Sequence, residues 1–173
     1  MGSRGKWNEE GVPHKGWTCV GVVDLEEPSQ TCEMCESAQI RYAHHMEHPG
    51  YAQMLTVGCE CAANMEEDYA AAGRREASMR RNAAKKSRWT GRRWRPSRDG
   101  NWWLRTQDGF RVVIYRDKQR PEFWCGLVID TIFYDRKLSS KQLHATLDAA
   151  KLAAFDTMIA LEASRFPALP TGG

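Results

Sequence analysis

The alternation of apolar and polar residues is clearest in the first third of the chain. Residues 17–24 are rich in β-branched valines and precede an acidic turn at 26–29, which predicts a strand. Residues 39–46 place large side chains at every second position, and 54–58 follow a His-Pro-Gly turn at 48–50. The pattern therefore predicts one strand followed by a β-hairpin.

A helical stretch is expected after the hairpin, with an interruption at Gly73. Residues 74–88 continue with Arg, Glu, Ala, Met and Lys, which favour helix, but they have almost no apolar stripe. A helix that is polar on all sides is either solvated or bound to a charged partner. Residues 89–101 contain two glycines and a proline and are expected to form a loop.

The last third of the chain shows a second β pattern and then a helical one. Residues 102–107 and 110–116 flank Asp108-Gly109, a dipeptide typical of a two-residue hairpin turn, and 123–133 supply a third strand. Apolar residues recur at helical spacing from about 141 to 164. This part is therefore predicted to be a β-β-β-α unit whose helix packs one face on the sheet.

Four cysteines form two close pairs, Cys32 with Cys35 and Cys59 with Cys61. Two pairs at this separation suit one tetrahedral Zn²⁺ ion, whose ligands usually come from two tight turns. The first pair can form a knuckle turn. The second opens a helix, where unpaired N–H groups stabilise thiolates. We therefore predict that all four cysteines hold one structural zinc ion.

The order knuckle, hairpin and ligand-bearing helix over residues 17–72 resembles a treble-clef zinc module. That module commonly spaces its second pair Cys-x-x-Cys, whereas here the pair is Cys-x-Cys. The run Cys-x-x-Cys, Arg-Tyr-Ala-His-His-Met-Glu-His and Val-Gly-Cys-Glu-Cys-Ala also resembles uncharacterised zinc-binding proteins of bacterial phages and mobile elements. This resemblance implies a metal site and names no activity.

Alternatives to a four-cysteine site stay open. His44 or His48 could replace one cysteine ligand, or the two histidines could bind a second metal ion, although a strand separates them by about 13 Å. A catalytic zinc would need an open position and a nearby acid or base, and the deaminase pattern is absent. Cys19 and Cys125 are expected to be buried small hydrophobes.

The net charge of +3 hides two segments of opposite sign. Residues 20–70 carry ten acidic and one basic residue, whereas 74–98 carry eleven basic and one acidic residue. Arginine forks bind phosphates and stack on bases, and interleaved tryptophans add stacking. The residues expected to bind nucleic acid, DNA or RNA, are Arg74, Arg75, Arg80, Arg81, Lys85, Lys86, Arg88, Trp89, Arg92, Arg93, Trp94, Arg95 and Arg98.

The sequence contains none of three common enzymatic motifs: the phosphate-binding loop, the nucleophile elbow and the glycine pattern of dinucleotide-binding folds. The first residues do not show the pattern of a signal peptide and no apolar run reaches about 18 residues, so a cytoplasmic protein without membrane association is expected. Helix, three strands, helix from about 66 to 164 resembles the order of double-stranded-RNA-binding domains. We therefore expect a non-enzymatic nucleic-acid-binding protein.

The competing hypothesis is a protein–protein adaptor or a phage-encoded inhibitor. Its acidic segment would mimic nucleic acid and bind a host protein or nucleoprotein. Under either hypothesis the fold class is α+β, with a small zinc-bound hairpin and helix, a basic helix, and a three-stranded antiparallel sheet packed by a C-terminal helix. The expected segments are a flexible N-terminus (1–15), an acidic zinc module (16–72), a basic helix and loop (73–100), a β-β-β-α unit (101–165) and a flexible tail (166–173).

Overall fold

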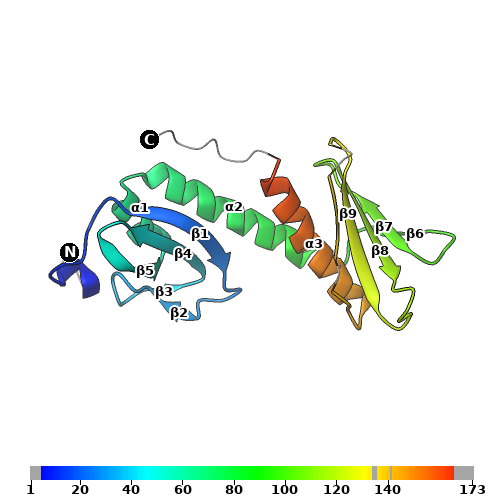
Figure 1. Cartoon of the computed structure of the whole chain (residues 1–173), viewed down its shortest axis with the longest axis horizontal. Helices are drawn as coiled ribbons and strands as arrows, with labels where there is room; N and C mark the ends of the chain where they lie inside the picture. Colours follow the sequence, from blue (N-terminus) through cyan, green and yellow to red (C-terminus); the bar gives the residue numbers. More distant parts are fainter. Residues whose placement is uncertain (1–4, 134–135, 141, 166–173) are drawn as a thin grey trace. The chain divides into compact units, whose positions relative to one another are not determined.

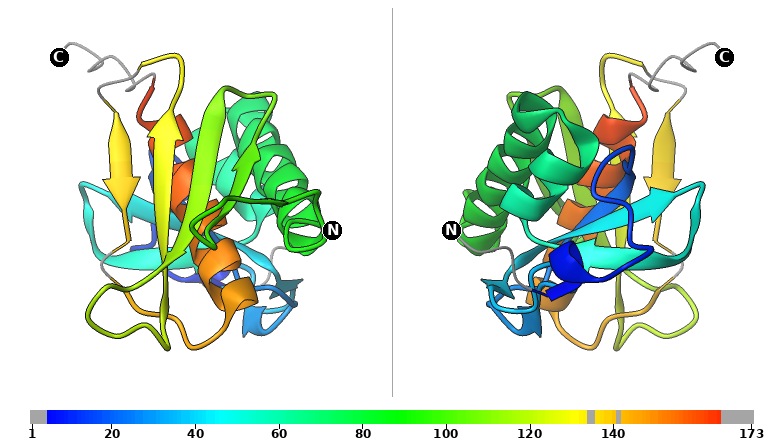
Figure 2. Two further views of the ribbon diagram at one scale, coloured as in Figure 1. Left: turned by 90° about the vertical axis from the view of Figure 1, so that its right-hand side faces the viewer. Right: turned by 90° about the vertical axis from the view of Figure 1, so that its left-hand side faces the viewer.

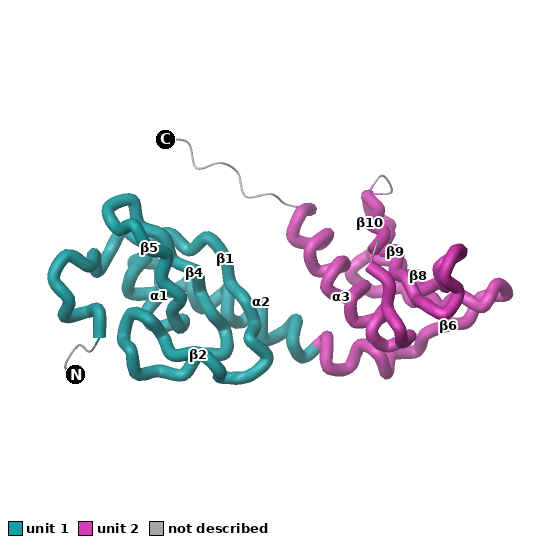
Figure 3. The backbone as a smooth tube through the Cα atoms, turned by 60° about the horizontal axis from the view of Figure 1, so that its bottom comes forward, with its two compact units in different colours: residues 1–84 teal, residues 85–173 magenta. Residues whose placement is uncertain are grey.

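A computed structural model describes residues 5–133, 136–140 and 142–165. The chain divides into two compact units, Met1–Ala84 and Lys85–Gly173 (Figure 3). The division falls inside the segment 73–100 that the sequence suggested as one piece. The expected flexible tail at 166–173 and the first four residues of the expected flexible N-terminus lie outside the described residues.

Unit 1 contains a three-stranded antiparallel sheet of order β1-β4-β5 (Figure 1). Its strands are β1 (Thr18–Asp24), β4 (Tyr42–His48) and β5 (Tyr51–Val57). The predicted hairpin is therefore the pair β4 and β5, and the predicted first strand joins it at the edge of β4. Two short strands, β2 (Gln30–Thr31) and β3 (Gln39–Ile40), pair on either side of the first cysteine pair.

The N-terminal segment packs against this unit, contrary to the expectation of a flexible stretch. A 3-10 helix, η1, spans Gly5–Asn8, and Trp7 packs against the core. Val12 is buried, and the indole N–H of Trp17 donates to the carbonyl oxygen of Pro13 at 2.7 Å. Burial of apolar side chains thus holds residues 5–17 on the unit.

Two helices follow the sheet, and the break between them is not at Gly73. Helix α1 spans Cys59–Glu66 and ends at Glu67, which adopts the left-handed conformation with φ 61°. Helix α2 spans Tyr69–Ser87 and passes through Gly73 without interruption, because a single glycine in a helix costs only about 1 kcal/mol. Among the described residues of α2, only Ala72 is buried. This agrees with the absence of an apolar stripe in the sequence of the helix.

Unit 2 contains a five-stranded antiparallel sheet of order β10-β9-β8-β7-β6. The three predicted strands are β7 (Trp102–Arg105), β8 (Phe110–Arg116) and β9 (Trp124–Asp130). The expected three-stranded sheet is wrong in number, because β6 (Arg95–Pro96) and β10 (Lys137–Ser139) add a short strand at each edge. The connection between β7 and β8 has four residues rather than the predicted two.

Helix α3 (Leu147–Ala163) covers one face of this sheet (Figure 2, left, where α3 lies behind the strands). It begins later than predicted, because Thr146 is its N-cap and accepts a hydrogen bond from the backbone N–H of Ala149. Phe155 and Ala154 of α3 are buried with the inward-facing residues of β8 and β9. The described residues form no helix that is both long and apolar enough to cross a membrane.

A buried ion pair closes one end of unit 2. The guanidinium group of Arg165 donates two hydrogen bonds to Asp130, Nε to Oδ2 at 2.7 Å and Nη2 to Oδ1 at 2.9 Å. Asp130 is fully buried and also accepts from the backbone N–H groups of Ile132 and Phe133. The hydrogen bonds from Arg165 lower the pKa of Asp130 to about 2, against the desolvation that raises it.

This pKa predicts an acid-labile contribution to the stability of unit 2. Because the folded pKa is lower than the ordinary value of 3.8, the contribution is complete above about pH 4 and is lost as the pH falls toward 2. The substitution Asp130→Asn is expected to cost unit 2 about 1–3 kcal/mol at pH 7, since it removes the charge that neutralises Arg165 and replaces one of the two acceptor oxygens with an N–H donor. Amide hydrogen exchange measures the change, and exposed Asp99→Asn, expected to stay within about 0.5 kcal/mol of wild type, is its control.

Candidate metal centre and basic surface

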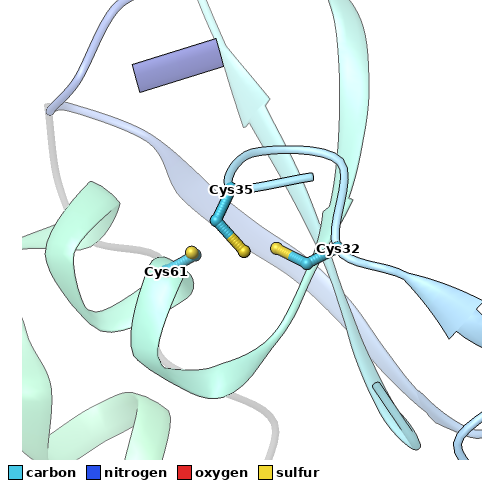
Figure 4. A group of neighbouring side chains, drawn as sticks. All are labelled: Cys32, Cys35 and Cys61. Atoms are coloured by element: carbon cyan, nitrogen blue, oxygen red, sulfur yellow. The ribbon is translucent and has the colours of Figure 1, made fainter. Parts of the chain in front are cut away.

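Three of the four predicted cysteine ligands lie together in unit 1. The sulfur atoms of Cys32, Cys35 and Cys61 all lie within 4.8 Å of one another. In Figure 4 the sulfurs of Cys32 and Cys35 point from the turn after β2 toward that of Cys61 on α1. Three converging thiolates are ligands that Zn²⁺ and other soft or borderline metal ions prefer. We call these residues the thiolate group.

Backbone hydrogen bonds shape the first pair into the predicted knuckle. The N–H of Cys32 donates to the carbonyl oxygen of Ala38 and the N–H of Glu36 to that of Cys32, each at 2.8 Å. Gly5 adopts φ 65°, and a Cβ atom there would lie 2.8 Å from backbone atoms of the knuckle. Only glycine therefore lets η1 approach this closely, and the approach brings the indole N–H of Trp7 to the sulfur of Cys61.

Hydrogen bonding within the thiolate group favours deprotonation of one cysteine. The thiol of Cys61 donates to the sulfur of Cys32, which lowers the pKa of Cys32 and raises that of Cys61. Burial opposes the shift at Cys32, whereas backbone N–H groups of Cys35, Gly58 and Met34 add to it. The group thus holds a thiolate at neutral pH, and a thiolate is the form of cysteine that binds a metal ion.

The fourth predicted ligand, Cys59, lies in a different group. Its sulfur, a ring nitrogen of His44 and a carboxylate oxygen of Glu76 lie within 4.8 Å of one another. The reason is helical geometry: Cys59 and Cys61 are both in α1, and residues two apart on a helix differ by about 200° in direction. The alternative ligands His44 and His48 are not in the thiolate group either; the His48 ring packs against Trp17.

Both groups border one pocket of unit 1, with a volume of about 740 Å³. Cys32, Cys35 and Cys61 line it, as do Cys59 and Glu76, and His44 lies fully buried beneath. Burial, together with the hydrogen bond to Glu76, raises the pKa of Cys59 to about 11. Without a metal ion, therefore, Cys59 remains a protonated thiol at neutral pH.

Many cations of the predicted nucleic-acid-binding segment are paired within the protein. Arg75 pairs with Glu66, and Arg80 with Glu76. Lys85 contacts Asp108 at 3.3 Å and Lys86 contacts Asp156 at 2.9 Å. The exposed residues of the segment that make no ion pair among the described residues include Arg74, Arg81, Arg93, Arg95 and Arg98.

The two tryptophans predicted to stack on bases are core residues, so this part of the prediction is wrong. Trp89 is 1% exposed and Trp94 is 8% exposed. The indole N–H of Trp89 donates to the carbonyl oxygen of Lys151 at 2.8 Å, and the ring packs edge-on against Phe155 at 5.1 Å. Neither ring has a free face to offer a base, because both fill the space beside α3.

The face of the sheet opposite α3 carries a set of cations that sequence reasoning missed. Strand register aligns Arg95, Trp103, Val113 and Leu127 in one row, and Arg105, Arg111, Ile129 and Lys137 in the next. In Figure 2 (left) no other helix or strand formed by the described residues of unit 2 covers this face. We call it the open face. The open face could have been recognised in the sequence, because residues 102–116 alternate between side chains that face the core and side chains that face outward.

Trp103 is the aromatic residue at the centre of the cations on the open face. The guanidinium groups of Arg95 and Arg111 each lie over its ring, 5.3 Å from the centroid. Trp103 and Leu104 line a small hollow of about 260 Å³ together with Arg93, Arg95 and Arg105. Trp103 is therefore a tryptophan that lies among arginines on the protein surface, and it lies outside the predicted segment 74–98.

Charge on the open face works against folding. Arg105 and Arg111 lie directly opposite each other on β7 and β8, and like charges at such positions destabilise a sheet. Within the described residues, none of Arg95, Arg105, Arg111 and Lys137 makes an ion pair. Unit 2 as a whole has seventeen basic and nine acidic residues, a formal charge of +8.

Comparison of the chain with protein-family models, with curated proteins and with solved structures finds no match.

The contrast between the buried and open-face tryptophans can be tested by substitution. Trp89→Ala is expected to destabilise unit 2 by about 3–5 kcal/mol, because it leaves a cavity beside α3. Trp103→Ala is expected to cost much less, since its ring is only half-buried and lies beneath two guanidinium groups. Urea unfolding followed by amide exchange in unit 2 measures both changes. Equal costs for the two variants would contradict the assignment of Trp103 to an open surface.

Proposed function

We propose that the protein is a non-enzymatic, zinc-stabilised nucleic-acid-binding protein, and that the open face of unit 2 contacts the nucleic acid. One observation carries the proposal: four cations on the open face are neutralised by no acidic residue among the described parts of the chain, and two of them repel each other across adjacent strands. A polyanion would remove this repulsion and release its own counterions on binding.

The side chains of the open face suit a nucleic acid better than an acidic protein. Three of the four cations are arginines, whose planar forks match phosphate oxygens and the O6 and N7 atoms of guanine. Trp103 presents a half-buried ring between two guanidinium groups, which can stack on a base or pack against a sugar. Arg93, which is exposed and lines the same hollow as Trp103 and Arg105, extends the cationic surface beyond β6.

The shape of the open face favours duplex DNA. The neighbouring strands β7 and β8, which carry Arg105 and Arg111, form a ribbon whose strand axes lie about 5 Å apart. The major groove of B-form DNA is about 12 Å wide and admits a two-stranded β-ribbon, whereas the major groove of A-form RNA is too deep and narrow for side chains to read. The arginines of β7 and β8 would then reach base edges, and those near β6 would contact the backbone.

In this proposal the thiolate group holds Zn²⁺ and supports unit 1. Cys32, Cys35 and Cys61 would supply three of the four ligands that a structural zinc ion takes. When bound, the ion neutralises the thiolates and cross-links the knuckle to α1. Unit 1 has a small core of its own, so this cross-link is expected to supply on the order of 10 kcal/mol of apparent stability.

Nucleic-acid binding is tested with the full chain and fluorescent duplex DNA, duplex RNA and single-stranded DNA of equal length. Tightest binding to duplex DNA is expected, with affinity falling roughly 10²-fold between about 50 and 200 mM salt if four phosphates are contacted. Reversal of Arg95, Arg105, Arg111 and Lys137 to Glu should abolish it. Reversal of Lys118 and Arg120, exposed in the β8–β9 connection, is the control and should weaken binding only slightly.

Two results of this titration would contradict the proposal. One is an affinity that does not change with salt. The other is equal loss of binding in the open-face and control variants, which would reflect net charge alone. Absence of binding to all three polymers at low salt would favour a protein partner instead.

A single substitution separates binding from stability. Arg105→Thr removes one member of the like-charge pair and adds a β-branched residue, so it is expected to raise the stability of unit 2 by a few tenths to about 1 kcal/mol. The same change should weaken DNA binding and lower the salt slope by about 0.9. Arg105→Lys, which keeps the charge, should preserve most of both properties. A loss of stability in Arg105→Thr would argue that Arg105 is structural.

Loss of one thiolate should remove the metal ion from the thiolate group. Cys61→Ser is expected to lower the zinc content by at least one equivalent per chain and to abolish slow amide exchange in unit 1, while unit 2 keeps its protection. Cys19→Ser, in the same unit but outside the group, should keep the zinc content of wild type. Unchanged zinc content in Cys61→Ser would exclude the thiolate group as the site.

A further inference from the structure

The imidazole of His44 is a buried polar group without a hydrogen-bond partner. Its side chain is fully buried in β4, between Val22 of β1 and Val57 of β5. Neither Nδ1 nor Nε2 makes a hydrogen bond in the part of the chain that the structure describes. Each unsatisfied buried polar atom costs about 1–3 kcal/mol, so a residue of this kind calls for a ligand or a partner.

Cys59 and Glu76 meet His44 from two different helices. Gly58 precedes α1, and a Cβ atom on it would lie 2.9 Å from the side chain of Ile40, so the absence of a side chain lets α1 begin close to β3. This start places Cys59 at the first position of α1. Glu76 lies in the second turn of α2, and its carboxylate comes within 4.8 Å of both other ligand atoms.

The three atoms are already near the spacing that a metal ion requires. Zinc bonds of about 2.0–2.3 Å to nitrogen, sulfur and oxygen place tetrahedral ligand atoms about 3.3–3.8 Å apart. The observed limit of 4.8 Å needs only a small closure. Imidazole, thiolate and carboxylate are all zinc ligands, and coordination would satisfy one of the two unpartnered nitrogens of His44.

The surrounding charges permit such an ion. One carboxylate oxygen of Glu76, Oε1, accepts a hydrogen bond from Arg80, which leaves the second oxygen available. Arg75 lies close enough to affect both His44 and Cys59, but Glu66 neutralises its charge. Cys59 and Glu76 line the 740 Å³ pocket, so an ion held by three protein ligands would have its fourth position toward that pocket.

We propose that His44, Cys59 and Glu76 form a second zinc site, distinct from the thiolate group, with a coordination position open to solvent or to a small anionic ligand. The mixed nitrogen, sulfur and oxygen set favours Zn²⁺ over Ca²⁺ or Mg²⁺, which take oxygen ligands. A site with three protein ligands exchanges its metal more readily than a closed four-ligand site. The proposed second site also gives a role to the Cys-x-Cys spacing, which directs the sulfur of Cys61 to the thiolate group and the sulfur of Cys59 to His44.

Zinc stoichiometry of the full chain tests this site. After loading with Zn²⁺ and removal of the excess, native mass spectrometry should find two ions per chain in wild type and one in Glu76→Gln. His44→Leu should also hold one, and because it replaces an unsatisfied polar group with an apolar one, its zinc-free form should be at least as stable as that of wild type. Cys19→Ser, which lies in the same unit but in neither group, is the matched control and should hold two ions as wild type does.

The variants Cys59→Ser and Glu76→Gln distinguish this site from a four-cysteine site. If Cys59 instead completed the thiolate group, wild type and Glu76→Gln would each hold one ion and Cys59→Ser would hold none, which would overturn the second site while leaving a structural zinc. Nitrogen NMR of the His44 ring in wild type gives a readout that needs no variant. Zinc loading is expected to change the chemical shift of one His44 ring nitrogen to a value typical of a metal-bound imidazole. An unchanged His44 spectrum would also overturn the proposal.

Discussion

Two residues that are two positions apart on an α-helix cannot direct their side chains to the same point, and the arrangement of unit 1 follows from this constraint. Both Cys59 and Cys61 lie in the first turn of α1. The helix therefore turns Cys61 toward the knuckle and Cys59 toward His44 and α2. What resembles one four-cysteine site in the sequence becomes two separate groups of ligand atoms that border the same pocket.

In unit 2 the dominant feature is the difference between the two faces of one sheet. The inner face is apolar and packs against α3, and the buried pair Asp130 and Arg165 satisfies the charges near its edge. The open face instead aligns cations across neighbouring strands, which costs stability in the isolated protein. Binding sites commonly lower the folding stability of a protein in this way, because the partner supplies the missing interactions when it binds.

Much of the element order was predictable from the sequence, whereas the side-chain groupings were not. Alternating strands, the Asp108-Gly109 connection and the helix without an apolar stripe all appear, since local patterns determine them. The break between α1 and α2 depends on the left-handed conformation of Glu67, which no composition rule indicates. Trp89 lies beside arginines in sequence but packs against α3, and its partners there are more than sixty residues away. The separation of the Cys59 and Cys61 sulfurs could have been predicted, because both residues were expected at the start of one helix and residues two apart on a helix point in different directions.

A proton–nitrogen NMR titration of the zinc-loaded chain with duplex DNA, followed through the tryptophan indole N–H signals, tests most directly whether the open face binds DNA. A large, saturable shift is expected for Trp103 on the open face. Little change is expected for Trp89 and Trp94, whose N–H groups already donate to the carbonyl oxygens of Lys151 and Trp89. If the Trp103 signal stayed fixed while DNA bound, the contact surface would lie elsewhere and the open face would not be the binding site.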